Sequence, residues 1–122
     1  MKIEVMKGIY QICKVTGIPE IRDTGFLMSV TITEEEISVV CLEEIKLEGV
    51  LSKETSFRVF KVAGPLDFSL VGIIAAISGI LAEAEISIFT LSTFNTDYIL
   101  VKENQMEKSI ELLLQNNYEI VR

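Results

Sequence analysis

The second half of the chain carries the pattern that most limits its fold, an alternation of strand-like and helix-like segments. Phe57–Val62 is apolar and strand-like, and Gly64 and Pro65 interrupt it before a long, nearly uncharged helical stretch. The later segments are again apolar runs separated by breakers. The expected elements are strands over 57–63, 86–94, 97–102 and 118–121 and helices over 69–84 and 105–116.

This β-α-β-β-α-β order is that of the ferredoxin-like arrangement, in which a four-stranded antiparallel sheet carries both helices on one face. The second helix fits such a place, because its apolar residues fall on one side at helical spacing and its charged residues on the other. Asn104 and Glu107 have the spacing of a capping box at its start. The sequence therefore predicts an α+β fold.

The first half of the chain reads as strands with little helix. Glycine and proline residues between 16 and 25 mark a loop, and the polar segment Glu43–Glu54 is expected to link the two halves. Residues 1–54 and 55–122 are therefore predicted to be two separate parts of the chain. The strands expected in the first part are Lys2–Val5, Ile9–Val15, Phe26–Ile32 and Ile37–Leu42.

The first helix of the second half has almost no polar face. Small residues such as Gly72, Ala76 and Gly79 stand where charges would be expected. A helix that is apolar or small all round is usually buried on both sides. Either the first half of the chain covers it, or it packs on its mate in a homodimer. The hydrophobic fraction of 49% favours a covering partner, and a homodimer is expected.

Acidic residues outnumber basic ones and give the chain a net charge of −7. This charge repels phosphate backbones and anionic headgroups, so neither nucleic acid nor a membrane is an expected partner.

Glu4 interrupts the N-terminus before a signal-peptide core forms, and the longest apolar run, Leu70–Ala82, is shorter than the ~20 residues that cross a bilayer. A cytoplasmic location is expected. Glu34–Glu36 is interpreted as a solvated turn rather than a cation site.

Histidine is absent, which removes the commonest metal ligand and the commonest general base at neutral pH. No phosphate-binding loop, paired-carboxylate motif or cysteine metal spacing is evident. Cys13 and Cys41 each lie in an apolar segment and are expected to be buried structural thiols, with a paired or redox role as the alternative. No catalytic residue, cofactor or metal site is predicted, and the chain is not expected to be an enzyme.

The segment after the strand 57–63 offers the groups that a small zwitterion needs. An amino acid presents an ammonium and a carboxylate, so its receptor needs an anionic acceptor close to N–H donors. Asp67 supplies the acceptor, and free amides near Ser69 and Leu70, at the expected helix start, supply the donors. Asp67 or Ser69 acting only as a helix cap is the simpler alternative. Phe68, and Phe94 further along, are expected to be core residues rather than stacking platforms.

The turn after the strand 86–94 provides a second set of polar groups. Asn95 and Asp97 are residue types that hold tight turns, and the same groups can contact a ligand. Ser92 and Thr93 are either plain strand residues or hydroxyl partners for a polar ligand. The segment Ser92–Asp97 also weakly resembles Ser29–Glu34 in the first half of the chain. This echo indicates an internal repeat whose first copy has degenerated.

Three segments together resemble ACT domains, namely Gly64–Ser69, Leu81–Ile88 and Ser92–Val101. The resemblance is to small bacterial tandem-ACT proteins, whose domains are similar to the regulatory domains of aspartate kinase and to the animal cytosolic arginine sensor. It covers residues 57–121 well, and the first half matches chiefly through Thr33–Cys41. The chain is thus expected to join a C-terminal, ferredoxin-like βαββαβ ACT domain to a degenerate, strand-rich ACT-like N-terminal half.

The resemblance implies a regulatory protein that binds an amino acid at an interface between ACT domains. The family's catalytic domains are missing from the chain, so a client enzyme would be a separate protein. A structural interaction module without a ligand is the alternative, and an unaided enzyme is the least favoured. The residues that the resemblance assigns to the ligand site are Leu66, Asp67, Phe68, Ser69, Leu70, Ser92, Thr93, Asn95 and Asp97.

Overall fold

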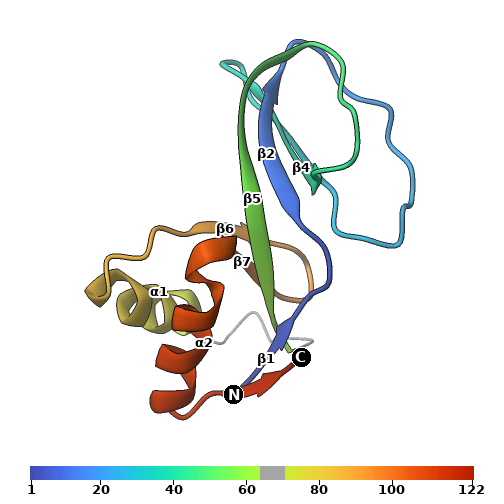
Figure 1. The fold of residues 1–122 in the computed structure, drawn as a ribbon. Helices are drawn as coiled ribbons and strands as arrows, with labels where there is room; N and C mark the ends of the chain where they lie inside the picture. The colour runs from blue at the N-terminus through green and yellow to red at the C-terminus, as the bar shows by residue number, and fades with distance from the viewer. Residues whose placement is uncertain (64–70) are drawn as a thin grey trace. The chain divides into compact units, whose positions relative to one another are not determined.

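The computed structural model describes residues 1–63 and 71–122, which form two compact units. The N-terminal unit contains residues 8–57, and the C-terminal unit contains residues 1–7 together with 58–122 (Figure 1). The first strand of the chain thus belongs to the unit built mainly from the second half. The predicted boundary between an ACT-like half and an ACT domain near residue 54 stays a prediction.

The described residues confirm a mixed α+β fold, with eight strands, two α-helices and one short 3-10 helix. In chain order these elements are β1 (Lys2–Val5), β2 (Tyr10–Val15), β3 (Ser29–Ile32), β4 (Ile37–Leu42), β5 (Val50–Val62), α1 (Ile73–Glu83), β6 (Phe89–Ser92), β7 (Asp97–Lys102), the 3-10 helix (Glu103–Gln105), α2 (Met106–Gln115) and β8 (Glu119–Val121).

The sheet of the C-terminal unit has the strand order β6-β7-β5-β1-β8. Ile3 of β1 pairs with Val62 in an antiparallel ladder on one side and with Ile120 in a parallel ladder on the other. The four-stranded, wholly antiparallel sheet expected from the sequence is therefore wrong, because β1 lies between β5 and β8. The local pattern of Lys2–Val5 predicts a strand, but it cannot predict that this strand pairs with β5 and β8, which are distant in the sequence.

Both helices of the C-terminal unit pack against one face of this sheet through a shared core (Figure 1). α1 contributes Ile77 and Leu81, which are buried, while its small residues are exposed. The residues that the sheet contributes to this core alternate along β5 and β7, and the neighbouring residues Val59 and Leu100 are buried as well. The buried residues of this core are Ile3, Phe60, Val62, Ile77, Leu81, Ile86, Ile99, Val101, Met106, Ile110 and Leu113.

α1 starts later than expected, whereas α2 starts within one residue of the expected position but lacks the expected cap. α1 begins at Ile73 rather than near residue 69, and its N-cap position is taken by Gly72, which has a φ of 78° and no side chain to cap with. The capping box predicted for α2 is also wrong, because the 3-10 helix moves the α-helical start to Met106 and no side chain caps it. Glu107 instead accepts a hydrogen bond from the Arg122 guanidinium.

The N-terminal unit is an antiparallel sheet with the order β3-β4-β2-β5. Its residues 8–57, all described, contain no helix. The segment Glu43–Glu54 is not wholly a linker as expected, since β5 starts at Val50 and pairs with β2, where Val15 lies opposite Val50. Residues 50–54 of β5 are exposed, with apolar Val50 and Leu51 followed by polar residues, so no apolar alternation was available to reveal the strand and backbone pairing defines it.

Candidate functional site

The turn between β6 and β7 is held by the side chain of Thr93. Its Oγ1 accepts a hydrogen bond from the Thr96 amide at 3.4 Å and donates one to the Thr96 carbonyl oxygen at 3.2 Å. Ser92 and Asp97 are paired across the hairpin, and the Ser92 hydroxyl donates to the Asp97 carboxylate at 2.5 Å. Ser92, Thr93 and Asp97 thus lie together, with Asn95 exposed in the turn between them.

Thr96, which the sequence analysis did not select, fixes this turn to the end of β5. Its side chain is buried, and its hydroxyl donates a short hydrogen bond to the Val62 carbonyl oxygen. Only Ala63 separates Val62 from the segment 64–70. Turn residues are normally exposed, so a threonine at this position gave no signal of burial. The turn is therefore anchored at the place where the chain leaves β5.

Five predicted site residues, Leu66, Asp67, Phe68, Ser69 and Leu70, lie outside the described residues. The chain is described on both sides of them. The Ala63 amide donates to the Lys2 carbonyl oxygen at 2.9 Å, and the Ala76 amide donates to the Gly72 carbonyl oxygen at 2.9 Å in the first turn of α1. The ligand-binding and capping roles predicted for Asp67 and Ser69 stay predictions.

Phe94 is not a core residue, contrary to the expectation. It is 79% exposed, because β6 ends at Ser92 and Phe94 occupies the turn that follows. The strand expected over 86–94 extends beyond the observed end of β6. Phe94 was therefore expected to point into the core as a strand residue. An exposed phenylalanine beside Ser92 and Asp97 adds apolar surface to this end of the hairpin.

The hairpin of β3 and β4 in the N-terminal unit is built in the same way. Thr33 Oγ1 accepts hydrogen bonds from the amides of Glu35 at 3.1 Å and Glu36 at 3.0 Å, and the Thr33 amide donates to the Glu36 carbonyl oxygen at 2.9 Å. The three glutamates are exposed, which confirms the solvated turn. Thr33 corresponds to Thr93 in this geometry, so the weak echo read from the sequence was out of register.

The two units also use matching positions for the sheet side of their cores. In the N-terminal unit these positions are filled by smaller residues, Cys13, Val15, Val39 and Cys41, packed against Met28, Ile45 and Leu47. A sequence signal for this match exists but was missed, since Lys14-Val15-Thr16-Gly17 at the end of β2 parallels Lys61-Val62-Ala63-Gly64 at the end of β5. The corresponding residues of the C-terminal unit are Phe60, Val62, Ile99 and Val101.

Both cysteines are buried and free, which confirms the structural interpretation. Burial raises the pKa of the Cys13 thiol above its ordinary value of 9.0; the neighbouring Cys41 raises it further, while Lys53 opposes the shift. Burial likewise raises the pKa of Cys41, against a hydrogen bond from the Gln11 side chain. Thiols with raised pKa values are poor nucleophiles at neutral pH, so neither cysteine has the character of a reactive site.

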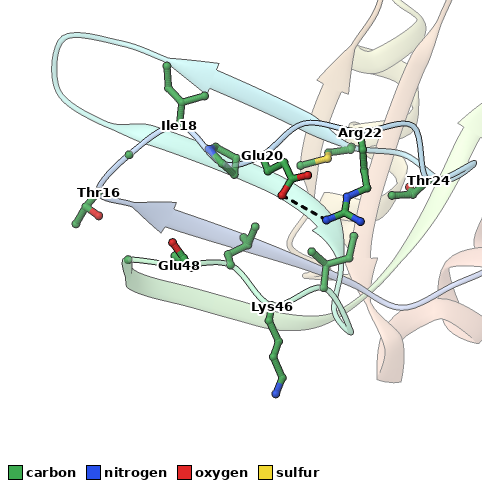
Figure 2. A pocket seen from close by; sticks show the side chains of 13 residues that line it. Thr16, Ile18, Glu20, Arg22, Thr24, Lys46 and Glu48 are labelled. Atoms are coloured by element: carbon green, nitrogen blue, oxygen red, sulfur yellow. Dashed lines mark ion pairs between the residues drawn. The ribbon is translucent and has the colours of Figure 1, made fainter.

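A cavity of about 720 Å³ lies in the N-terminal unit between residues 16–24 and residues 45–49. Figure 2 shows Glu20 and Arg22 on one wall, joined by an ion pair of 3.5 Å, and Lys46 extending away from them. The sequence analysis did not predict this cavity, because the loop 16–25 carries no motif of a binding site. Its lining combines apolar side chains with charges of both signs.

The described part of the chain has neither a metal-binding cluster nor a membrane-spanning helix. Residues 1–63 and 71–122 contain no cluster of three or more acidic or cysteine side chains that could hold a metal ion. The helices within the same ranges are also too short, or not apolar enough, to span a membrane.

Residues 52–115 match the family model of the ACT domain. Among curated proteins, the cytosolic arginine sensor for mTORC1 subunit 1 of Mus musculus is 34% identical over 105 residues, which is 80% of this chain and 31% of that protein. The Homo sapiens protein of the same name is 45% identical over 58 residues, 47% of this chain and 18% of that protein. The chain therefore spans less than a third of the length of these relatives.

Solved structures with a similar fold are also known. A crystal structure of an Agobacterium tumefaciens protein is 32% identical, covers 98% of this chain and 91% of its own, and has a TM-score of 0.88. The regulatory subunit of aspartate kinase from Thermus thermophilus, in its ligand-free form, is 10% identical with a TM-score of 0.62, over 94% of this chain and 97% of its own. At this identity the second structure supports the fold alone.

Proposed function

The chain belongs to the ACT domain family, and from this membership we propose that it is a non-catalytic regulatory module that binds a free amino acid at an interface between ACT domains. The name of one relative, a cytosolic arginine sensor, supports a regulatory role. In the same proposal the protein is cytoplasmic, and its client is a separate enzyme.

One observation carries the location of the site. The hydrogen bond from Thr96 to the Val62 carbonyl oxygen holds the β6–β7 turn at the strand end from which the chain continues toward Asp67. The hydroxyl and carboxylate groups of Ser92 and Asp97 therefore stand close to this exit. In the proposed site Asp67 accepts from the ligand's ammonium, and main-chain amides of the segment 66–70 donate to its carboxylate.

The two hairpins support a finer proposal on the fold. Thr33 and Thr93 close similar turns between strands of matching register, in which Ser29 lies opposite Val40 and Phe89 opposite Leu100. We take the C-terminal unit as a ferredoxin-like βαββαβ ACT domain with β1 added to its sheet. The N-terminal half, up to about residue 54, is then a degenerate ACT-like copy that has lost its helices.

A homodimer through α1 is part of the proposal. The face of α1 that carries Ala75, Ala76, Gly79 and Ala82 is exposed, and Val71 before it is 89% exposed. An uncharged face of small residues allows a second helix to approach closely. Gly79→Glu is expected to convert a dimer into a monomer in sedimentation equilibrium, whereas Gln115→Glu on α2 leaves the mass unchanged. A monomeric wild-type protein at all concentrations would contradict this arrangement.

The ligand is tested with a panel of free amino acids, with L-arginine included because a relative is named as an arginine sensor. At least one of them is expected to raise the Tm, and a concentration of 100 Kd adds about 2.7 kcal/mol of stability. Asp67→Asn abolishes this shift, whereas Glu119→Gln, which changes an exposed carboxylate on β8, preserves it.

The alternative function, an interaction module without a ligand, is favoured by the exposed face of α1. The interaction-module function replaces the sensor function if no amino acid raises the Tm, or if the Asp67→Asn protein shows every Tm shift of the wild type. Turnover of a substrate by the pure protein, which contains no histidine, would contradict both proposals.

A further inference from the structure

We propose that the cavity of the N-terminal unit is a second small-molecule site, which takes an α-amino acid with an aliphatic side chain. This inference goes beyond the site proposed above, because all 13 lining residues lie within residues 8–57 and none belongs to 64–70 or Ser92–Asp97. The two sites can therefore be present or absent independently.

The cavity exists because the N-terminal unit lacks the helical layer. In the C-terminal unit, residues of α1 and α2 such as Leu81 and Leu113 cover the apolar face of the sheet. The matching face of the N-terminal unit is covered only by loop residues, including Met28, Ile45 and Leu47. Loops that replace two helices leave space above the sheet, and this space is the cavity.

The apolar part of the lining is suited to an aliphatic group. Met28, Ile45 and Leu47 are half-buried and form the side of the cavity next to the core. Ile18, on the loop above, remains 62% exposed. A branched aliphatic side chain placed between them removes apolar surface from water on both walls, and such burial is favourable at roughly 25 cal/mol per Å².

The charged part of the lining matches a zwitterion. Four charged residues, Glu20, Arg22, Lys46 and Glu48, line the cavity. Lys46 extends away from Glu20 and Arg22, so this ion pair is the part of the lining that presents one charge of each sign to a ligand. Glu20 and Arg22 satisfy each other at 3.5 Å, with their side chains 80% and 69% exposed. An α-amino acid can insert between them, because its carboxylate matches the guanidinium and its ammonium matches the carboxylate.

Size is consistent with this ligand class. Pockets that bind small molecules commonly occupy about 300–1,000 Å³, and this cavity is about 720 Å³. A nucleotide or another polyanion would meet a protein of net charge −7 and only one well-directed cation, Arg22. The balance of charge and apolar surface therefore selects a small neutral zwitterion.

Met28 provides a readout confined to this cavity. The chain has four methionines, of which Met28 lines the cavity and Met106 lies in the core of the C-terminal unit. With methyl-labelled methionine in the full chain, L-leucine, L-valine and L-methionine serve as probes. At least one is expected to shift the Met28 methyl signal saturably and to leave Met106 unchanged. Isovalerate and isoamylamine, which each lack one of the two charges, bind at least about tenfold more weakly.

Charge variants test whether Arg22 binds the carboxylate of the ligand. Arg22→Gln is expected to weaken the binding of the same probe by about 10–100-fold, the factor typical of a hydrogen bond to a charged group. Lys14→Gln removes an exposed cation from β2, outside the cavity, and leaves the affinity unchanged. Both positions are exposed, so neither change threatens the fold.

The proposal is overturned if no probe moves the Met28 signal up to ~10 mM. It is also overturned if isovalerate binds as well as L-leucine, or if Arg22→Gln and Lys14→Gln have equal effects. The same titration in the Asp67→Asn protein separates the two sites, since the Met28 response is expected to survive there. Loss of that response in Asp67→Asn would mean that the cavity is not an independent site.

Discussion

The N-terminal and C-terminal units use the same hairpin and differ in what covers the sheet. Thr33 and Thr93 close equivalent turns, and both sheets direct an apolar face toward a core. In the C-terminal unit α1 and α2 complete that core, whereas in the N-terminal unit the loops 16–28 and 43–49 take their place. The comparison teaches that a hairpin can persist while the layer above it changes from a packed core to a cavity.

Side-chain size differs with this change. Phe60 and Val101 face the helices of the C-terminal unit, and Cys13 and Cys41 hold the corresponding positions under the loops. A large apolar side chain needs a covering element to remove its surface from water, whereas a small one has less apolar surface that must be buried. The N-terminal unit therefore tolerates a thinner cover, and its stability is expected to depend less on any single covering residue.

The largest effect is expected from removing a helix residue that covers the sheet. Leu113→Ala on α2 deletes a fully buried side chain and should lower the free energy of unfolding by about 2–5 kcal/mol in urea titrations. Leu114→Ala, on the same helix but 53% exposed, is the matched control and should cost far less. Leu47→Ala, the counterpart in the loop cover, should fall between them. Equal costs for Leu47→Ala and Leu113→Ala would break the comparison.

The next effect concerns the closely packed end of the N-terminal unit. Gly49 has a φ of 68°, and a Cβ there would overlap Thr16 Oγ1; Gly25 has a φ of 78° with nothing within 4 Å. Gly25→Ala should cost about 1–2 kcal/mol for the left-handed backbone alone. Gly49→Ala should add about 1–3 kcal/mol of overpacking, measured by thermal unfolding. If the two variants have the same Tm, the loop at Thr16 is looser than the structure indicates.

The two turns should respond differently to loss of a polar group. Thr96→Val leaves the Val62 carbonyl oxygen without its hydroxyl partner and should cost about 1–3 kcal/mol in chemical denaturation. Glu36→Gln, at the matching turn position of the N-terminal unit, is exposed and should stay within about 0.5 kcal/mol of the wild type. A neutral Thr96→Val would show that the anchor of the candidate ligand site is dispensable.

The smallest effect is a dependence of stability on alkaline pH, confined to the N-terminal unit. Both cysteine thiols have a pKa raised above 9.0, so the folded state keeps its protons at a pH where the unfolded chain loses them. The stabilisation is complete below pH 9 and is lost as the pH rises through the folded-state pKa values. Protection of both thiols from an aromatic disulfide reagent at neutral pH checks the same burial, and rapid labelling of the folded protein would contradict it.

Local elements were predictable where an apolar pattern and a breaker coincide. β1, β4 and β7 have the expected bounds, because each is a short strand-like segment that ends at polar or turn-forming residues. The exposed half of β5 and the late start of α1 at Ile73 were missed. In the first case only backbone pairing defines the strand, and in the second Gly72 ends the preceding segment without any capping side chain.

The candidate site was predictable in part. Ser92, Thr93 and Asp97 do lie together, because they flank one tight hairpin and are close in sequence. Thr96 and the cavity beside Arg22 were not predicted. Their significance depends on contacts with Val62 and with the loop 45–49, which are distant in sequence and leave no local pattern.

The sequence by itself determined the composition-dependent properties of this protein, namely an acidic chain without histidine, an α+β order of elements and the family resemblance of its second half. The tertiary structure alone decided that β1 enters the sheet beside β5 and β8, and that loops rather than helices cover Cys13 and Cys41. The physical reason is that hydrophobic periodicity specifies which face of an element is buried, whereas the partner that buries it is selected by the packing of the whole chain.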